Sequence, residues 1–295
     1  MKNKLLILII VSTMTSCSDT SLKTISAGNY LVTINANTGA RIVSFKFKNQ
    51  ELLLQQEIHP EFYGSTLWPS PQSVWNWPPP KTLDIEPYQV EKIADGFRFT
   101  SQNDSLTGLQ FNKRILLADG VLTASYQAIN VSKKTIRAAL WEVTRVKGGL
   151  TFFPLATLKA PADSLSNLKS VETINNVLWY TFDEDEVKNE AQKLFANGEG
   201  GWLAHIENGM CFIKVFDNVN ISEIPPQQGE IELYVNDKAT YVELENHSVY
   251  QTLAPGEKIN YTLRWFYFPL PPEIIVRAGE QKLINIVHKH IKNLK

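Results

Sequence analysis

The amino-acid sequence predicts a mostly β protein in which antiparallel sheets pack as a sandwich, with a short C-terminal helix. Three observations predict this fold class. Apolar and polar residues alternate over many short runs, which is typical of strands with one buried face. Turn pairs such as Asp95-Gly96 and Asn208-Gly209 separate these runs. Only two stretches have a helical pattern, so the runs are not joined by helices.

The N-terminus has the pattern of a bacterial lipoprotein signal. Two lysines precede an apolar stretch over residues 5–11, and small or polar residues then lead to Cys17. This stretch is too short to cross a hydrocarbon core, which needs about twenty residues. We therefore expect a signal peptide over residues 1–16, a lipid on Cys17, and an anchor on the periplasmic face or cell surface of a bacterial membrane. The alternative is an ordinary secretory signal in which Cys17 is incidental.

Residues 17–28 are polar and lack apolar periodicity, which predicts a lipidated tether. Residues 29–295 are then expected to form a single domain, because β sandwiches often run to about 200–250 residues undivided. The chain has two cysteines, so a lipid on Cys17 leaves Cys211 without a disulfide partner. The net charge of −1 provides no sequence-wide field that would favour nucleic acid.

Period-two alternation begins at residue 29. Residues 30–35 and 40–48 are expected to form a hairpin around a turn that ends at Gly39. Further strands are expected at residues 89–100, 109–117, 121–130, 136–146, 202–206, 211–216, 230–235, 240–250 and 258–268. Their close and regular spacing favours antiparallel pairing in a sandwich.

Residues 64–88 have the most distinctive composition of the chain. Trp68, Trp75 and Trp77 lie among prolines, including the run at residues 78–80. Proline cannot donate to a β ladder, so we expect a stiff extended loop rather than a central strand. Tryptophans fixed on such a loop offer flat apolar surfaces that suit the C–H face of a sugar ring. The alternative is that the rings only cap an open end of the sandwich.

Residues 140–154, LWEVTRVKGGLTFFP, contain a second candidate site. As a strand, this segment places Glu142 and Thr144 on one face, and Trp141 and Arg145 on the other. Glu142 and Thr144 are expected to hydrogen-bond a polyhydroxyl ligand, while the opposite face enters the core or makes a second contact. The alternative is a solvated face on an edge strand.

A third candidate lies at residues 240–257, TYVELENHSVYQTLAPGE. Alternation puts Tyr241, Glu243, Glu245 and His247 on one face of a strand. Two carboxylates and an imidazole on one face can supply a general acid and a general base. The same spacing also occurs in any half-exposed strand, which is the alternative.

Two stretches have helical character. Residues 183–196 begin with acidic side chains and predict one short helix, and residues 278–292 predict an amphipathic helix docked on the sandwich. In the second, His288 and His290 are expected at the surface. The sequence has no paired metal-ligand spacing, Gly-rich phosphate loop or Gly-x-Ser-x-Gly elbow. We therefore expect no metal and no cofactor.

Four motifs resemble the galactose mutarotase-like, or aldose epimerase-like, superfamily, and in particular a bacterial branch described as a domain of unknown function. They lie at residues 38–45, 67–84, 141–149 and 243–257. The resemblance implies a large antiparallel β supersandwich whose concave face binds sugars. Within the second motif, Gln72 and Asp84 join Trp68, Trp75 and Trp77 as candidate ligand-binding residues, and the third adds Trp141, Glu142, Thr144 and Arg145.

In mutarotases of this superfamily, a late-strand glutamate acts as base and a histidine as acid to open and close the pyranose ring. Glu243 and Glu245 lie at a position similar to that of the glutamate, and with His247 they are the candidate catalytic residues. The central strand carries Glu142 and Thr144 where the resemblance calls for a histidine. Ring opening would therefore lack its usual proton donor.

These residues support three hypotheses about function. The first is an envelope lipoprotein that binds carbohydrate through its tryptophans and carboxylates. The second is a sugar-active enzyme, an epimerase or mutarotase variant with Glu243 or Glu245 as base and His247, Glu142 or a tyrosine as acid. The third is an assembly or interaction protein whose tryptophan loop contacts a partner in the envelope.

Overall fold

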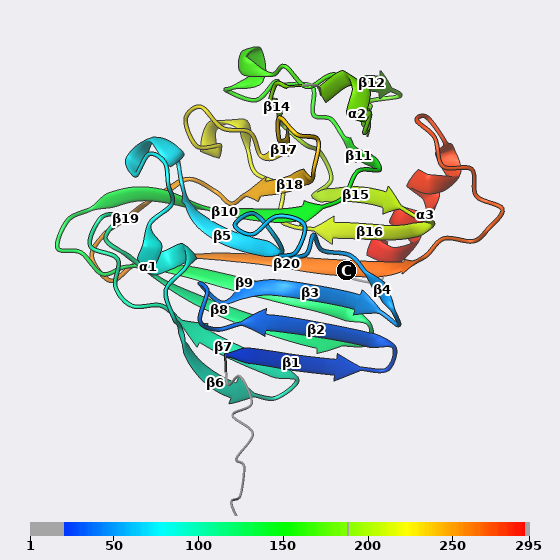
Figure 1. The fold of residues 1–295 in the computed structure, drawn as a ribbon. Coiled ribbons are helices and arrows are strands. Elements are labelled where there is room, and N and C mark those ends of the chain that lie inside the picture. Colours follow the sequence, from blue (N-terminus) through cyan, green and yellow to red (C-terminus); the bar gives the residue numbers. More distant parts are fainter. Residues whose placement is uncertain (1–20, 188, 293–295) are drawn as a thin grey trace, which may run out of the picture.

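The computed structural model describes residues 21–187 and 189–292. These residues form two ten-stranded antiparallel sheets that pack face to face, with three short α-helices (Figure 1). The fold class predicted from the sequence, a large β supersandwich with a short C-terminal helix, is confirmed. The predicted signal peptide over residues 1–16 and the lipidation site Cys17 lie outside the described residues. No helix among the described residues is long and apolar enough to cross a membrane.

The first sheet begins at the N-terminal hairpin and ends at a short edge strand. Its strands are, in spatial order, β1 (Leu22–Ala27), β2 (Tyr30–Asn35), β3 (Arg41–Phe47), β5 (Ser65–Ser70), β10 (Ile136–Val146), β18 (Val242–His247), β17 (Ile231–Val235) and β14 (Gln192–Ala196). Two further strands pair at its margins, β4 (Gln50–Glu51) with β3 and β19 (Gln251–Leu253) with β10.

The second sheet contains three of the four longest strands among the described residues. Its order is β12 (Val171–Ile174), β13 (Val177–Thr181), β11 (Leu150–Pro154), β15 (Trp202–Glu207), β16 (Met210–Val215), β20 (Lys258–Pro269), β9 (Val121–Asn130), β8 (Leu109–Ala118), β7 (Gly96–Thr100) and β6 (Gln89–Ile93). Neighbouring hairpins turn where positive φ is needed, as at Asn208 (φ 49°) and Gly209 (φ 73°) between β15 and β16. The turn pairs in the sequence therefore mark real hairpins.

The main core lies between the two sheets. Alternate residues of β8 are fully buried there, among them Phe111 and Ile115, because period-two alternation places every second side chain on the inner face. From the opposite sheet, Leu67, Leu233 and Leu244 enter the same cluster. The outward face of β5, β10, β18 and β17 is consequently the face turned away from this core.

Helix α3 (Gln281–Ile291) covers the outer surface of the second sheet. Its apolar side, with Leu283, Ile284 and Val287, joins a second buried cluster with side chains such as Phe152 and Trp179. This confirms the amphipathic helix expected over residues 278–292. The other helices are short: α1 (Lys81–Asp84), α2 (Glu184–Val187) and the 3₁₀ turns η1 (Gln72–Val74), η2 (Asp163–Leu165) and η3 (Ile221–Glu223).

Two sequence-based predictions about elements are wrong. Most of the described part of the predicted tether, residues 22–27, is strand β1, which pairs along its whole length with β2. Of the helix expected over residues 183–196, the described residues contain only α2, and the last five residues, 192–196, form strand β14 instead. In β14, the alternate residues Gln192, Leu194 and Ala196 are buried, and the strand pairs with β17. This tertiary pairing overrides the helical tendency suggested by the acidic residues at the start of the segment.

The proline-rich segment also departs from its prediction, because residues 65–70 form the central strand β5 rather than a loop. Pro69 is tolerated there because its partner Leu140 directs its N–H and C=O away from β5, to the hydroxyl and the N–H of Ser248. Pro69 thus occupies a pair that uses no ladder bond between β5 and β10. Its carbonyl accepts a hydrogen bond from Trp75 Nε1 instead, at 2.9 Å.

Candidate functional site

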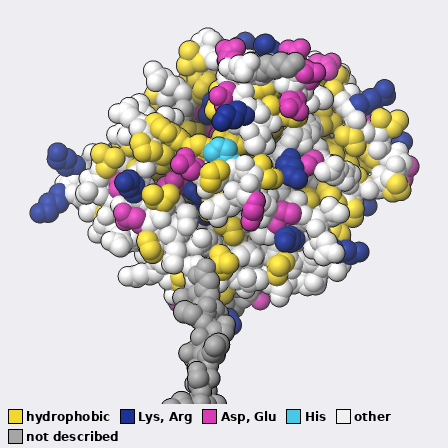
Figure 2. Space-filling model, viewed as in Figure 1, with side chains coloured by type: hydrophobic (Ala, Val, Ile, Leu, Met, Phe, Trp, Pro, Cys, Tyr) yellow, Lys and Arg dark blue, Asp and Glu magenta, His cyan; other side chains and the backbone are white. Residues whose placement is uncertain are grey.

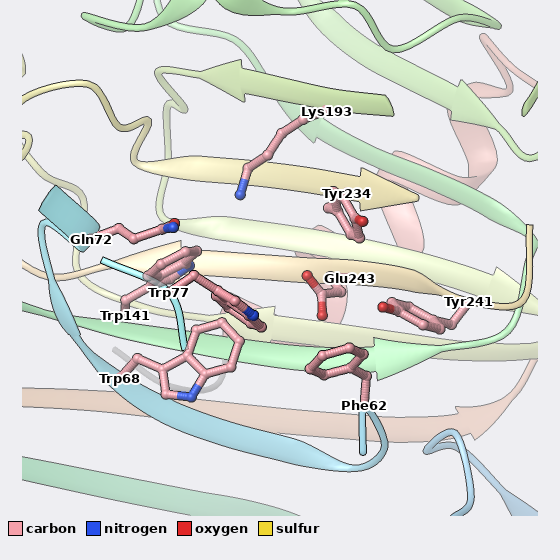
Figure 3. Close-up of a pocket in the computed structure, with 9 residues that line it drawn as sticks. All are labelled: Phe62, Trp68, Gln72, Trp77, Trp141, Lys193, Tyr234, Tyr241 and Glu243. Atoms are coloured by element: carbon pink, nitrogen blue, oxygen red, sulfur yellow. The ribbon is translucent and has the colours of Figure 1, made fainter. Parts of the chain in front are cut away.

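A hollow of about 380 Å³ lies on the outward face of the first sheet. Antiparallel register aligns Arg145 (β10), Glu243 (β18), Tyr234 (β17) and Lys193 (β14) in one row across four strands. The residues that line the hollow are Phe62, Trp68, Gln72, Trp77, Trp141, Lys193, Tyr234, Tyr241 and Glu243 (Figure 3). In this view the three indoles gather at one side, and Glu243 lies between them and Tyr241.

The indoles support one another. Trp68 and Trp141 face each other across β5 and β10, with ring centroids 5.1 Å apart, and both are buried. Trp77 is 53% exposed, yet its ring lies 5.8 Å from that of Trp68, 6.4 Å from Trp75 and 5.8 Å from Phe62. Contacts with three rings hold an exposed indole in place, so little conformational entropy remains to be lost when a ligand covers it.

Glu243 is held by a buried arginine. Arg145 Nε donates to Glu243 Oε1 at 2.7 Å, and the guanidinium carbon lies 5.3 Å and 5.5 Å from the ring centroids of Trp68 and Phe62. Arg145 is fully buried, whereas the carboxylate of Glu243 lines the hollow. Arg145 therefore fixes the orientation of the carboxylate and balances its charge from beneath the hollow.

A second group of charges lies under Trp141. Lys193 Nζ is 2.7 Å from Glu232 Oε2 and 3.0 Å from Glu245 Oε2, and Trp141 Nε1 donates to Glu245 Oε2 at 2.7 Å. Burial alone would lower the pKa of Lys193, but the two carboxylates raise it above its ordinary value. Lys193 is thus an ammonium at neutral pH.

The two carboxylates differ in their protonation. Burial raises the pKa of Glu245 to about 8, against the opposing effect of Lys193. Burial also acts to raise the pKa of Glu232, but Lys193 and His247 together lower it to about 2.

The ligand atoms of Glu232, Glu245 and His247 lie within 4.8 Å of one another, a spacing that suits a metal ion. Lys193 already contacts both carboxylates and supplies the positive charge that an ion would bring.

The family of the chain follows from comparison with family models. The model of a domain of unknown function, DUF4380, matches residues 61–268, which include the tryptophan segment and strands β5, β10, β18, β17 and β14 beneath the hollow. The chain belongs to the DUF4380 family. No curated protein matches the sequence of this DUF4380 protein.

Solved structures share the fold at low sequence identity. A galactose mutarotase-like protein from Lactobacillus casei ATCC 334 is 14% identical with a TM-score of 0.58, over 83% of this chain and 99% of that chain. A putative aldose 1-epimerase from Escherichia coli K12 is 11% identical with a TM-score of 0.52, over 84% and 99%. A TPR-domain containing protein from Parabacteroides distasonis ATCC 8503 is 18% identical with a TM-score of 0.61, over 87% and 49%. The DUF4380 protein therefore has the galactose mutarotase-like fold.

The structure brings some of the expected ligand-binding residues together and separates others. Trp68, Gln72, Trp77 and Trp141 line the hollow. Trp75 is buried behind them, and its Nε1 bonds to the backbone. Two others are also supports: Arg145 holds Glu243, and Asp84 Oδ1 accepts from Trp68 Nε1 at 2.8 Å.

Glu142 and Thr144 were expected to bind a ligand, and this prediction is wrong. Both are fully buried and face the interior of the sandwich. Glu142 Oε2 lies 2.5 Å from Lys214 Nζ, while its other oxygen accepts from Thr144 and from the hydroxyl of Ser65. Neither the ligand-binding face nor the solvated edge considered from the sequence is correct, because β10 is a central strand buried on both faces.

The three candidate catalytic residues have different positions. Glu243 lines the hollow, whereas Glu245 and His247 are fully buried. The His247 ring stacks on Trp141 with centroids 5.2 Å apart, and its Nε2 lies 3.1 Å from Glu232 Oε1. Burial lowers the pKa of His247, so the imidazole is neutral at pH 7 and is covered by the indole.

Sequence reasoning missed three residues of the hollow: Phe62, Lys193 and Tyr234. The alternation at residues 230–235 already placed Tyr234 on one face of a strand, and that signal was available. Lys193 was missed because its segment was predicted to be helical, so the residue was not assigned to a strand face. Phe62 lies in a loop with no periodic pattern. Beside it, the ring of His59 contacts Tyr241 at a centroid distance of 5.4 Å, and His59 Nδ1 accepts from the N–H of Phe62.

The charge around the hollow is mixed. Acidic, basic and hydrophobic side chains are interspersed on the face of the described chain shown in Figure 2, and no continuous basic surface lies there. Nucleic-acid sites need such a surface. A ligand with apolar faces and many hydroxyl groups fits this chemistry better than a polyanion.

Proposed function

We propose that this DUF4380 protein binds a saccharide in the hollow lined by Trp68, Trp77, Trp141 and Glu243. The observation that carries the proposal is the convergence of three indoles and one oriented carboxylate on a single cavity of about 380 Å³. Ligand pockets commonly have volumes of about 300–1,000 Å³, mostly apolar walls and a few convergent polar groups. The galactose mutarotase-like fold supports a role that involves sugars.

The two kinds of lining residue suit the two kinds of surface on a sugar. The C–H face of a pyranose ring is apolar and stacks on an exposed indole such as Trp77. The hydroxyl groups around the ring edge bond to the Glu243 carboxylate, the Gln72 amide and the Lys193 ammonium. Hydrogen bonds to charged groups are worth about 1.5–3 kcal/mol each, so Glu243 and Lys193 would fix the orientation of the ligand.

The expected affinity for a single sugar is modest. A hexose has about a dozen non-hydrogen atoms, and at about 0.3 kcal/mol per atom it binds with roughly 4 kcal/mol, near a millimolar Kd. Calorimetric titration of the full chain with mono- and oligosaccharides tests the proposal, with Glu243→Gln as the site variant and the exposed Glu199→Gln as the matched control. Heat of binding that is reduced only in Glu243→Gln supports the proposal, and no saccharide binding at tens of millimolar would reject it.

A second candidate function is ring opening of an aldose by a variant of the epimerase mechanism. It is favoured by the position of Glu243, whose carboxylate is held by Arg145 beside the hydroxyl-bearing rings of Tyr234 and Tyr241. Glu243 would take the proton of the anomeric hydroxyl. A tyrosine hydroxyl would deliver one to the ring oxygen, since burial raises the pKa of both tyrosines and keeps them protonated.

Polarimetry on freshly dissolved α-anomers distinguishes the two functions. An enzyme speeds the approach to anomeric equilibrium, and Glu243→Gln abolishes that increase. A binding protein leaves the rate at its uncatalysed value while calorimetry still detects the sugar. A rate increase that survives Glu243→Gln would contradict the assignment of Glu243 as base.

We also propose that the protein is exported and anchored to a bacterial membrane through a lipid on Cys17. Strand β1 begins at Leu22, so a lipid at Cys17 would hold the sandwich close to the membrane surface. Metabolic labelling with a radioactive fatty acid tests this. The label is expected on the wild-type chain and not on Cys17→Ser, and equal labelling of both would refute the anchor.

A further inference from the structure

A second hollow adjoins the first. It has a volume of about 400 Å³, and Phe62 and Trp77 line both hollows. The rings of these two residues lie 5.8 Å apart and form a low partition between the cavities. Trp77 is 53% exposed although its neighbours Trp68 and Trp75 are buried, so its indole is accessible at the boundary between the two spaces.

The second hollow has a preformed wall. Arg41 is 4% exposed, its Nη1 donates to the carbonyl of Glu61 at 2.7 Å, and its guanidinium carbon lies 4.6 Å from the ring centroid of Tyr63. Arg41 Nη2 also lies 3.5 Å from Asp84 Oδ1, the carboxylate oxygen that accepts from Trp68. A single chain of contacts, from Arg41 through Asp84 to Trp68, therefore connects the walls of the two hollows.

The remaining lining combines ring surfaces with polar ends. Trp77, Tyr63 and two prolines, Pro78 and Pro79, provide apolar surfaces, and the exposed side chains of Gln56 and Lys81 are polar. The charged residues that line this hollow are two basic ones, Arg41 and Lys81, and two acidic ones, Glu61 and Asp84. Since they offset one another, they create no net field that would select a strongly charged ligand.

We propose that the two hollows form one extended site for an oligosaccharide of at least two sugar units, with the glycosidic linkage crossing Trp77. The first unit occupies the hollow that contains Glu243, and the next occupies the hollow that contains Arg41 and Lys81. This inference rests on the proposed saccharide function and adds the ligand class: a glycan chain rather than a free monosaccharide. A ligand that uses both cavities gains contact area without losing additional rigid-body freedom.

The experiment compares chain lengths. The full chain is titrated with glucose, galactose and mannose, and with the disaccharide and tetrasaccharide series built from each, and binding is followed by calorimetry and by tryptophan fluorescence. The expected result is a Kd at least tenfold lower for an oligosaccharide than for its own monosaccharide. Two variants act only on the second hollow: Lys81→Ala removes a polar contact, and Gln56→Trp fills the space from an exposed position.

Both variants are expected to bind the monosaccharide like the wild type and to lose most of the tenfold gain. The exposed Lys92→Ala, on β6 of the other sheet, is the matched control and should keep the gain. If monosaccharides bind and chain length brings no gain, or if the gain survives in both variants, the extended site is wrong and the proposed function stands. If none of the saccharides binds, the proposed function fails and the extended site fails with it.

Discussion

Replacing Trp77 by alanine removes the indole that is shared by the two hollows. The ring is 53% exposed, so a ligand can cover one of its faces. A fully buried tryptophan covers about 150–250 Å², and a sugar on one face would cover roughly 70 Å² of it. At about 25 cal/mol per Å², this contact contributes about 1.8 kcal/mol, which is roughly 20-fold in Kd.

The fold should tolerate the change. Half of the indole already faces solvent, so we expect Trp77→Ala to lower the free energy of unfolding by about 1 kcal/mol. The assay is calorimetric titration with the saccharide that binds best to the wild type, beside urea denaturation of each variant. Trp77→Phe keeps a smaller ring and should fall between the wild type and alanine.

Val74→Ala is the matched control, because Val74 is 51% exposed in the same segment and lines neither hollow. Its affinity should equal that of the wild type. Unchanged affinity in Trp77→Ala, with the protein folded, would refute the role of Trp77 as a stacking surface. Equal losses in Trp77→Ala and Val74→Ala would show that the segment acts through its conformation instead.

Three further predictions concern charged groups. Glu243→Gln keeps the shape of the side chain but removes its charge, so saccharide affinity should fall about tenfold, as calorimetry would detect. Glu142→Gln leaves Lys214 without its buried counter-charge, so urea denaturation should show a loss of about 3–5 kcal/mol while the folded protein keeps its affinity. Burial raises the pKa of Glu230 to about 7, so the free energy of unfolding should fall by about 3 kcal/mol as pH rises from 4.5 to 7, and Glu230→Gln should flatten that slope.

The sign of the last effect follows from linkage. Between pH 4.5 and 7 the unfolded chain has lost the proton of Glu230 and the folded chain still holds it, so raising the pH favours unfolding. An unchanged slope in Glu230→Gln would contradict the assigned pKa. For Glu142→Gln, a loss of affinity without a loss of stability would restore the ligand-binding role that its burial argues against. For Glu243→Gln, full affinity would remove the carboxylate from the site.

The strands and hairpins were predictable because their signals are local. Alternation identifies a strand from a few residues, and pairs such as Asn208-Gly209 adopt the positive φ that a tight hairpin requires. Alternation also predicted correctly which side chains share a face within each strand. Trp141 and Arg145 share one face of β10, and Glu243 and Glu245 share one face of β18. Alternation does not predict which of the two faces of a strand points away from the core.

That gap explains the error at Glu142. Both faces of β10 are buried, one by the opposite sheet and one by the tryptophans, so polarity no longer distinguishes inside from outside. Glu142 is polar and interior because Lys214, distant in sequence and on the other sheet, neutralises it. A contact between residues on different sheets is a tertiary contact, and the local sequence pattern does not predict it.

Lys193 and Pro69 were missed for the same kind of reason. Lys193 belongs to a five-residue edge strand whose conformation comes from pairing with β17, which overrides the helical tendency of the preceding acidic residues. Pro69 sits in a central strand because Leu140 directs its hydrogen bonds to Ser248 on the other side. In both cases the deciding partner lies more than forty residues away in the chain.

The most direct test of the central claim is a crystal structure of the protein with the best-binding oligosaccharide. We expect a sugar ring whose C–H face lies against Trp77, with at least one hydroxyl group within hydrogen-bond distance of the Glu243 carboxylate. A saccharide bound elsewhere on the surface, with the hollow beside Trp77 and Glu243 left to solvent, would contradict the account.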